Sequence, residues 1–202
     1  LEVGHRGGVV LALLGVHEAQ PEGAKHASRQ GRIRLGEHRR RRLGRVVAHP
    51  LEDVVGGLGH ARGEQLDLLI IDRERGPAGI TGLSEFNYRD RRCIVGTWLG
   101  ADFWGTQVNR ESKAMIAYLG FELLGMNRIG SYSNPENERS TRALEAVGYS
   151  REGVLRQWHH HGERYLDVNI FGMLRDDWRA SGQAETEISS DGTPPSAFLQ
   201  AS

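Results

Sequence analysis

Aromatic residues are missing from the first third of this chain. Residues 1–65 contain no Phe, Tyr or Trp, and all fourteen aromatic residues lie between Phe86 and Phe198. Because aromatic side chains contribute much of the area that a core buries, we expect residues 1–65 to supply poor material for one. The segment also lacks Met, Asn, Thr and Cys, whereas it holds twelve glycines, ten arginines and six of the nine histidines.

Two interpretations of residues 1–65 stay open. The segment is either a flexible basic extension or a stretch that is not the natural translation of its gene. We favour the second interpretation, because Gly, Arg, Ala, Val, Leu and His crowd together when GC-rich DNA is read off-frame. The segment carries a net charge of +4 and the remainder −4, so that the formal net charge of the chain is zero.

The chain also has few cysteines, short apolar runs and no net charge. Cys93 is the only cysteine, so no intrachain disulfide can form, and we expect a reducing compartment, the cytoplasm. The early apolar stretch at residues 9–16 has about half the length of a membrane span, and we expect neither a signal peptide nor an anchor. A net charge of zero points to neither a nucleic acid nor a membrane as partner.

One run of like charge stands out against this balance. Residues 39–42 are four consecutive arginines, which would bind phosphate, but no aromatic residue accompanies them to stack on bases. We therefore favour solvated charge or an artefact over a nucleic-acid-binding module. The last 22 residues are rich in Ser, Gly, Ala and Pro and predict a disordered tail. The expected organisation is an atypical segment 1–65, a folded domain 66–179 and a tail 180–202.

The pattern from residue 66 onward predicts strands and helices in a fixed order. Short apolar runs between turn residues indicate strands, and apolar residues every three or four positions indicate helices. In the first helix this spacing directs Arg110, Lys113 and Glu122 away from the apolar face. The order is strand, strand, strand, helix, strand, helix, strand, strand, over residues 66–71, 80–86, 93–99, 109–124, 128–133, 137–148, 153–158 and 164–174. It predicts a mixed α/β (α+β) fold with a mostly antiparallel central sheet.

A glycine-containing loop joins the third strand to the first helix. Residues 98–113 read WLGADFWGTQVNRESK. The first N–H groups of a helix lack partners within it, and the helix dipole adds partial positive charge, so this geometry suits a pyrophosphate. Taken alone, the loop is equally compatible with a plain strand-to-helix turn.

Three further segments follow the loop at short spacing. They read NERSTRALEAVGY from Asn137, EGVLR from Glu152 and GERYLDV from Gly162. With the loop, they resemble the RimJ/RimL branch of the GNAT superfamily, the ribosomal-protein N-acetyltransferases and their relatives. The resemblance runs from about residue 66 to residue 178 and is absent from residues 1–65, where the family has its first strand and two helices that shape the acceptor site.

The resemblance implies the GNAT fold and a function. It implies transfer of an acetyl group from acetyl-CoA to a primary amine, a protein N-terminus or a small amine, by direct attack in a ternary complex. We expect no metal ion, because no Cys or carboxylate stands at zinc-like spacing from the histidines at residues 159–161. The alternative is a degenerate domain that binds CoA without catalysis, because relatives usually carry glycine where this chain has Gln107, and a side chain there would crowd the phosphates. The acceptor is not predicted, and a homodimer is left open.

The resemblance also assigns roles to individual residues. The loop would hold the CoA pyrophosphate, and the preceding strand end would line the pantetheine arm. The Asn137 amide would contact the pantetheine or the acceptor, and the Ser140 hydroxyl would lie near the sulfur. For Asn137, capping of the second helix is the alternative. The predicted coenzyme-binding residues are Leu99, Gly100, Phe103, Trp104, Gly105, Thr106, Gln107, Val108, Asn109, Asn137 and Ser140.

Amine acetylation requires a base, an oxyanion donor and an acid. Ser140 is the predicted proton donor to the departing thiolate. His159 is one candidate base, because an imidazole pKa near ~6.5 suits proton acceptance at neutral pH, and an exposed polar turn is its alternative. Glu85 is the other candidate base. Cys93 lies in the middle of a predicted strand, so we expect a buried core residue there and not a nucleophile.

Overall fold

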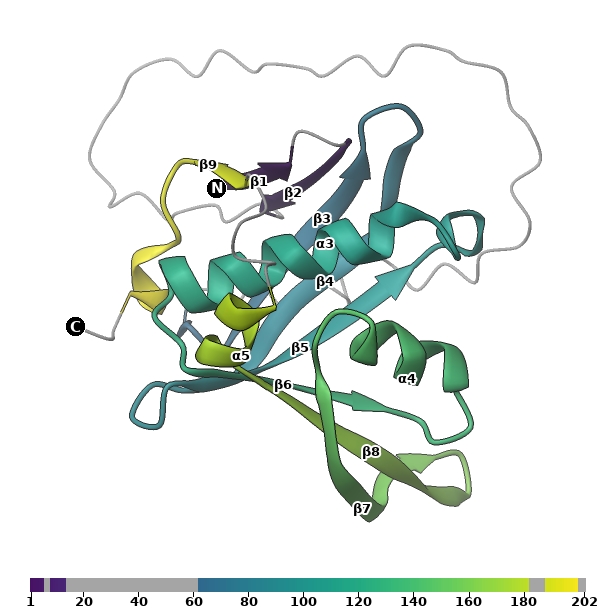
Figure 1. The fold of residues 1–202 in the computed structure, drawn as a ribbon. Coiled ribbons are helices and arrows are strands. Elements are labelled where there is room, and N and C mark those ends of the chain that lie inside the picture. Colours follow the sequence, from purple (N-terminus) through teal and green to yellow (C-terminus); the bar gives the residue numbers. More distant parts are fainter. Residues whose placement is uncertain (6–7, 14–61, 182–187, 200–202) are drawn as a thin grey trace, which may run out of the picture. The chain divides into compact units, whose positions relative to one another are not determined.

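A single mixed sheet organises the protein. The computed structural model describes residues 1–5, 8–13, 62–181 and 188–199 (Figure 1). Within them, nine strands form a sheet in the order β7-β8-β6-β5-β4-β3-β2-β1-β9. Neighbouring strands are antiparallel apart from β5 and β6, which are parallel. The predicted fold class, mixed α/β with a mostly antiparallel sheet, is therefore confirmed.

The elements follow the predicted order from residue 66 onward. The strands are β1 (Glu2–His5), β2 (Val9–Leu13), β3 (Gln65–Asp72), β4 (Gly76–Asn87), β5 (Arg92–Leu99), β6 (Arg128–Ser133), β7 (Ser150–His161), β8 (Arg164–Leu174) and β9 (Ile188–Asp191). The α-helices are α3 (Gln107–Tyr118), α4 (Glu138–Glu145) and α5 (Arg175–Ala180). Short helical turns are η1 (Ala101–Phe103), η2 (Leu119–Leu123), which is π-helical, and η4 (Ser196–Phe198).

The core lies between α3 and one face of the sheet (Figure 1). Leu66, Leu68 and Ile70 alternate along β3 and are fully buried, because alternate side chains of a strand share one face. Met115 and Ile116 of α3 are fully buried as well. The predicted apolar face of this helix is therefore present, but Lys113, predicted to point away from it, is also buried, with 8% of its surface exposed.

The described parts of both terminal segments belong to the sheet. Strand β2 pairs with β3, and β1 lies between β2 and β9. Val3, Val9 and Leu11 are buried in the core although composition predicts little core material there. Three aliphatic residues on short alternating strands suffice for this, since β-branched and aliphatic side chains pack well on a pleated sheet.

The chain end contributes an aromatic residue to the same core. Phe198 is fully buried, and its ring lies 5.3 Å from the ring of Phe86. Residues 188–199 therefore differ from the disordered tail that their polar composition predicts, because one large apolar side chain anchors them. The arginine run at residues 39–42 lies outside the described residues.

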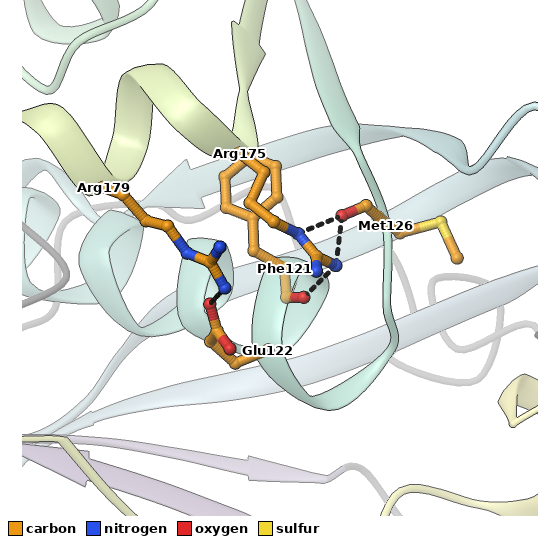
Figure 2. Close-up of polar contacts among 5 residues, drawn as sticks. All are labelled: Phe121, Glu122, Met126, Arg175 and Arg179. Carbon is orange, nitrogen blue, oxygen red and sulfur yellow. Dashed lines mark hydrogen bonds and ion pairs between the residues drawn. The ribbon is translucent and has the colours of Figure 1, made fainter.

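Arginines of α5 hold the end of the long helix (Figure 2). Arg175 donates hydrogen bonds from Nε and Nη2 to the carbonyl oxygen of Met126, at 3.0 and 2.7 Å, and from Nη2 to that of Phe121. Arg179 forms an ion pair with Glu122 at 2.9 Å. Because the last carbonyls of a helix lack partners within it, Arg175 satisfies groups that would otherwise be left unpaired after η2.

The two parallel strands separate along their length. Pairing between β5 and β6 covers only Arg92–Ile94 against Arg128–Gly130. Just beyond, Ser131 Oγ donates a hydrogen bond of 3.1 Å to the carbonyl oxygen of Val95. Past this contact the strands diverge toward the start of α3 and toward α4 (Figure 1). No helix among the described residues is long and apolar enough to cross a membrane.

Candidate functional site

A pocket occupies the opening between the diverging strands. Its volume is about 560 Å³, and it is lined by the end of β5, the following loop and the facing sides of α3 and α4. The lining residues are Thr97, Trp98, Leu99, Trp104, Gly105, Thr106, Asn109, Lys113, Asn137, Arg139, Ser140 and Ala143. The fold thus brings the glycine-containing loop together with Asn137 and Ser140, which lie about thirty residues further along the chain.

The loop before α3 turns sharply into the helix. Gly105 has φ +73°, a conformation that side chains disfavour, and this turn directs the chain into the helix. Thr106 is the N-cap: its Oγ1 accepts a hydrogen bond from the Val108 amide at 3.4 Å and donates one to the Phe103 carbonyl at 2.7 Å. The Thr106 amide also donates to the Phe103 carbonyl, at 3.4 Å. The N–H groups of Gln107 and Asn109 have no partner within the helix, so they are the ones available to an anion.

The predicted loop residues divide into two groups. Leu99, Trp104, Gly105, Thr106 and Asn109 line the pocket. Gly100, Phe103, Gln107 and Val108 do not: Phe103 and Val108 are buried in the core, Gln107 is exposed, and the Gly100 amide donates to the carbonyl of Ala78 at 2.9 Å.

A cation fixes the buried end of the loop. The Arg75 guanidinium lies 4.2 Å above the Phe103 ring and donates a hydrogen bond of 2.9 Å to the Asp102 carbonyl. Phe103 itself is 8% exposed and belongs to the hydrophobic core. The loop conformation is therefore set by contacts on the side away from the pocket.

Helix α4 brings Asn137 and Ser140 to the pocket. Asn137 is its N-cap, since its Oδ1 accepts a hydrogen bond from the Ser140 amide at 3.1 Å. Thr141 ties the helix to β6 through Ser133, with 3.1 Å between the two hydroxyl oxygens. Asn137 therefore caps the helix and lines the pocket at the same time.

Two cationic side chains in the pocket were missed by reasoning from the sequence. The Arg139 guanidinium lies 3.6 Å from the centre of the Trp104 ring, and the Trp104 indole donates to the Leu99 carbonyl at 3.0 Å. Lys113 reaches toward β5, with Nζ 3.5 Å from Thr97 Oγ1, and burial lowers its pKa to about 8. The signal was the four-residue spacing of Asn109 and Lys113, which places both on one side of α3.

The charge of the pocket lining has one sign. Lys113 and Arg139 are its only charged residues, and no Asp or Glu is among the residues that line it. Both cations line the same pocket as Asn109, in the first turn of α3. The arrangement suits a ligand with several negative charges.

The two candidate bases lie elsewhere on the sheet. Glu85 is exposed on β4 and has φ 52°, within an irregular stretch of the β4–β5 ladder. Burial raises the pKa of Tyr132, and the charge of Glu85 raises it further, so Glu85 lies near β6. His159 is exposed near the tip of β7, opposite Leu166. Neither candidate is among the residues that line the pocket.

The single cysteine lies in the core. Cys93 is 1% exposed on β5, and burial raises the pKa of its thiol to about 12. A thiol with such a pKa is protonated near neutral pH. The expectation of a buried core residue at this position is confirmed.

Comparison with known proteins agrees with the fold. The family described as Acetyltransferase (GNAT) domain matches residues 39–150. The match begins within the segment that composition sets apart, where the sequence alone shows no resemblance. Residues 39–61 of it lie outside the described residues.

Two bacterial relatives cover the same region. The uncharacterized N-acetyltransferase p20 of Bacillus licheniformis is 29% identical over 100 residues, which are 50% of this chain and 56% of the relative. The uncharacterized N-acetyltransferase YoaA of Bacillus subtilis is 29% identical over 97 residues, which are 48% of this chain and 55% of the relative. The chain thus spans about half the length of the curated relatives it matches.

A solved structure shares the fold. The crystal structure of spermidine N-acetyltransferase from Vibrio cholerae, in complex with CoA and spermine, has a TM-score of 0.58 and 21% identity, covering 64% of this chain and 76% of that one. Because the family match extends over more than half of the chain, this protein belongs to the GNAT acetyltransferase family.

Proposed function

We propose that this protein transfers an acetyl group from acetyl-CoA to a primary amine by direct attack in a ternary complex. The observation that carries the proposal is a pocket lined both by the loop and first turn of α3 and by Asn137 and Ser140. Its lining has two cations and no carboxylate, which suits the phosphates of CoA. The Vibrio cholerae structure of the same fold was solved in complex with CoA.

The proposed coenzyme pose runs from the start of α3 toward the point where β5 and β6 separate. The diphosphate lies at the N–H groups of Gln107 and Asn109 in the first turn of α3, where the helix dipole favours negative charge. The pantetheine arm runs along β5, which within the described residues forms no ladder pair with β6 beyond Ile94 and no hydrogen bond with it beyond Val95. The thioester then lies near Ser140.

The reaction is an aminolysis of a thioester. The amine nitrogen attacks the carbonyl carbon, the new C–N bond forms as the C–S bond breaks, and the thiolate takes a proton from Ser140 directly or through water. A serine hydroxyl is a weak acid, so its position supplies most of the effect. Glu85 and His159 remain the proposed acceptors of the proton that the amine loses. Neither side chain lines the pocket, so each would take this proton from an amine that approaches from outside the lining residues.

Finer points of the proposal rest on the sequence. The segments that begin at Asn137, Glu152 and Gly162 support assignment to the RimJ/RimL branch. We propose that residues 66–179 form the part of the domain that bears the site. The lone cysteine supports a reducing compartment, the cytoplasm.

The decisive experiment measures CoA thiol release from acetyl-CoA with a panel of amines. Cys93 is the only thiol of the chain and is buried, so the protein adds little background to a thiol assay. We expect release that depends on both protein and amine. Binding of CoA by calorimetry without thiol release for any amine would instead favour the non-catalytic alternative.

A pair of α4 variants tests the assigned site. We expect Ser140→Ala to lower kcat by about tenfold or more, since a positioned proton donor contributes on that order or above. Arg142→Ala is the matched control, because Arg142 lies on the same helix with its side chain 74% exposed in an ion pair with Glu138. Equal turnover in wild type and Ser140→Ala would remove Ser140 from the mechanism.

A further inference from the structure

Lysine is nearly absent from this chain, yet one lysine lines the pocket. Of 26 Lys and Arg residues, only Lys25 and Lys113 are lysine. Lys25 lies outside the described residues. Lys113 lines the pocket from α3, with 8% of its surface exposed. A guanidinium stays protonated in proteins, whereas a lysine amine can lose its proton on burial and become a nucleophile.

Lys113 reaches the part of the pocket where the reactive end of the coenzyme would lie. The contact between Ser131 Oγ and the Val95 carbonyl marks the point beyond which β5 and β6 separate. Thr97, which Nζ of Lys113 contacts at 3.5 Å, is two residues from Val95 and three from Gly100. It therefore lies about 7 Å along the strand from this point and about 10 Å from the loop.

The amine of Lys113 has weak polar contacts. Within the described ranges its side chain forms no ion pair with a carboxylate, and its hydrogen bond to Thr97 Oγ1 is long at 3.5 Å. That hydroxyl is shared with Thr81 Oγ1, 2.9 Å away. Burial lowers the pKa of Lys113 to about 8, so a substantial fraction of the amine is neutral near physiological pH. An unprotonated amine beside a thioester has the reactivity needed for acyl transfer.

We propose that Lys113 is a self-acetylation site, modified by acetyl-CoA bound in the same pocket when no acceptor amine is present. The lysine nitrogen attacks the thioester carbonyl carbon, an amide bond forms, the C–S bond breaks, and the proton lost by the amine protonates the CoA thiolate. No further reactant is needed. The proposal rests on the acetyl-CoA binding proposed above. Acetylation removes one of the two cations of the lining and adds bulk to the pocket, so it weakens coenzyme binding.

The test uses the full chain, acetyl-CoA and no acceptor amine. Peptide mass mapping over time measures acetylation at Lys113 and Lys25, the only two lysines. We expect Lys113 to be modified at least about tenfold faster than Lys25, because the bound thioester gives a high effective concentration. After unfolding in urea, the two rates should become similar. Lys113→Arg keeps a cation at this position and should abolish acetylation there, while acetylation of Lys25 serves as the reference.

Calorimetry with CoA on the same preparation separates the two proposals. CoA binding with no acetylation at Lys113, or equal rates at both lysines in the folded chain, would overturn self-acetylation and leave the proposed function standing. Failure to bind CoA would overturn both. A second readout is the affinity of the acetylated protein, which should bind CoA more weakly by about tenfold, the loss expected for one removed charge-assisted contact.

Discussion

At the scale of single residues, buried charge in the pocket is the most informative feature. Lys113 lies on α3 between the buried residues Ser112 and Ala114. Its burial lowers the pKa from 10.5 to about 8. A group whose pKa is lower in the folded state than in the unfolded state opposes folding while it must be protonated.

The first prediction is a pH-dependent gain in stability on removing this charge. Below pH 8 the cost of protonated Lys113 is constant and on the order of 3 kcal/mol; between pH 8 and 10.5 the unfolded chain binds more protons, so stability rises with pH. We expect Lys113→Met to raise the free energy of unfolding near pH 7 by on the order of 2 kcal/mol and much less near pH 10. Urea unfolding of both proteins at the two pH values measures this difference.

The difference in the free energy of unfolding between Lys113→Met and the wild type removes the contributions of titrating groups that both proteins share. Arg139 is the only other charged residue that lines the pocket, and it stays charged over this range. A stabilisation of equal size at both pH values would contradict the assigned cause, since packing of the methionine would then account for it.

Local patterns predicted some residues of the site and not others. Thr106, Gly105 and Asn137 belong to short motifs whose geometry depends on adjacent residues, such as a helix cap or a turn. Lys113 and Arg139 do not, because their burial or stacking depends on partners from other elements, Thr97 and Trp104. Helical periodicity placed Lys113 on the exposed side, and only the packing of α3 against diverging strands shows otherwise.

At the scale of elements, the end of the long helix depends on α5. The sequence predicts one helix over residues 109–124, whereas the structure has α3 followed by η2. The carbonyl groups of Phe121, in η2, and of Met126, just after it, accept hydrogen bonds from Arg175 (Figure 2). Such a contact between residues about fifty positions apart has no local sequence signal, so this ending of the helix could not be predicted.

The second prediction compares the two arginines of α5. We expect Arg175→Ala to lower the free energy of unfolding by about 2 kcal/mol, because the carbonyl groups of Phe121 and Met126 lose a charged donor. We expect Arg179→Ala to cost less than about 1 kcal/mol, because its ion pair with Glu122 is exposed to solvent. Chemical denaturation of the two variants side by side gives both values, and equal losses would show that Arg175 has no special role.

At the scale of the whole molecule, the sheet is larger than the sequence indicates. The central strands were predicted because their apolar runs are long and are bounded by turns. Strands β1, β2 and β9 are four or five residues long and were not predicted. Runs of this length carry little signal of their own, and they are ordered by pairing with a sheet that already exists.

The third prediction tests whether the chain end belongs to the domain. Phe198 is fully buried against Phe86, whereas the neighbouring Leu199 is 48% exposed. We expect Phe198→Ala to lower the free energy of unfolding by about 3 kcal/mol or more and Leu199→Ala to change it little. Thermal and urea unfolding of the two variants provide the measurement. A loss below about 0.5 kcal/mol for Phe198→Ala would mean that residues 188–199 act as a tail.

The short parallel ladder between β5 and β6 divides the sheet into two parts that few residue pairs connect. On one side of it lie β4, β3, β2, β1 and β9, on the other β8 and β7, and only three residue pairs bridge them. An elongated ligand that forms hydrogen bonds with both β5 and β6 beyond this ladder would connect the two parts of the sheet. Binding of such a ligand would then slow amide hydrogen exchange in strands that the ligand does not contact.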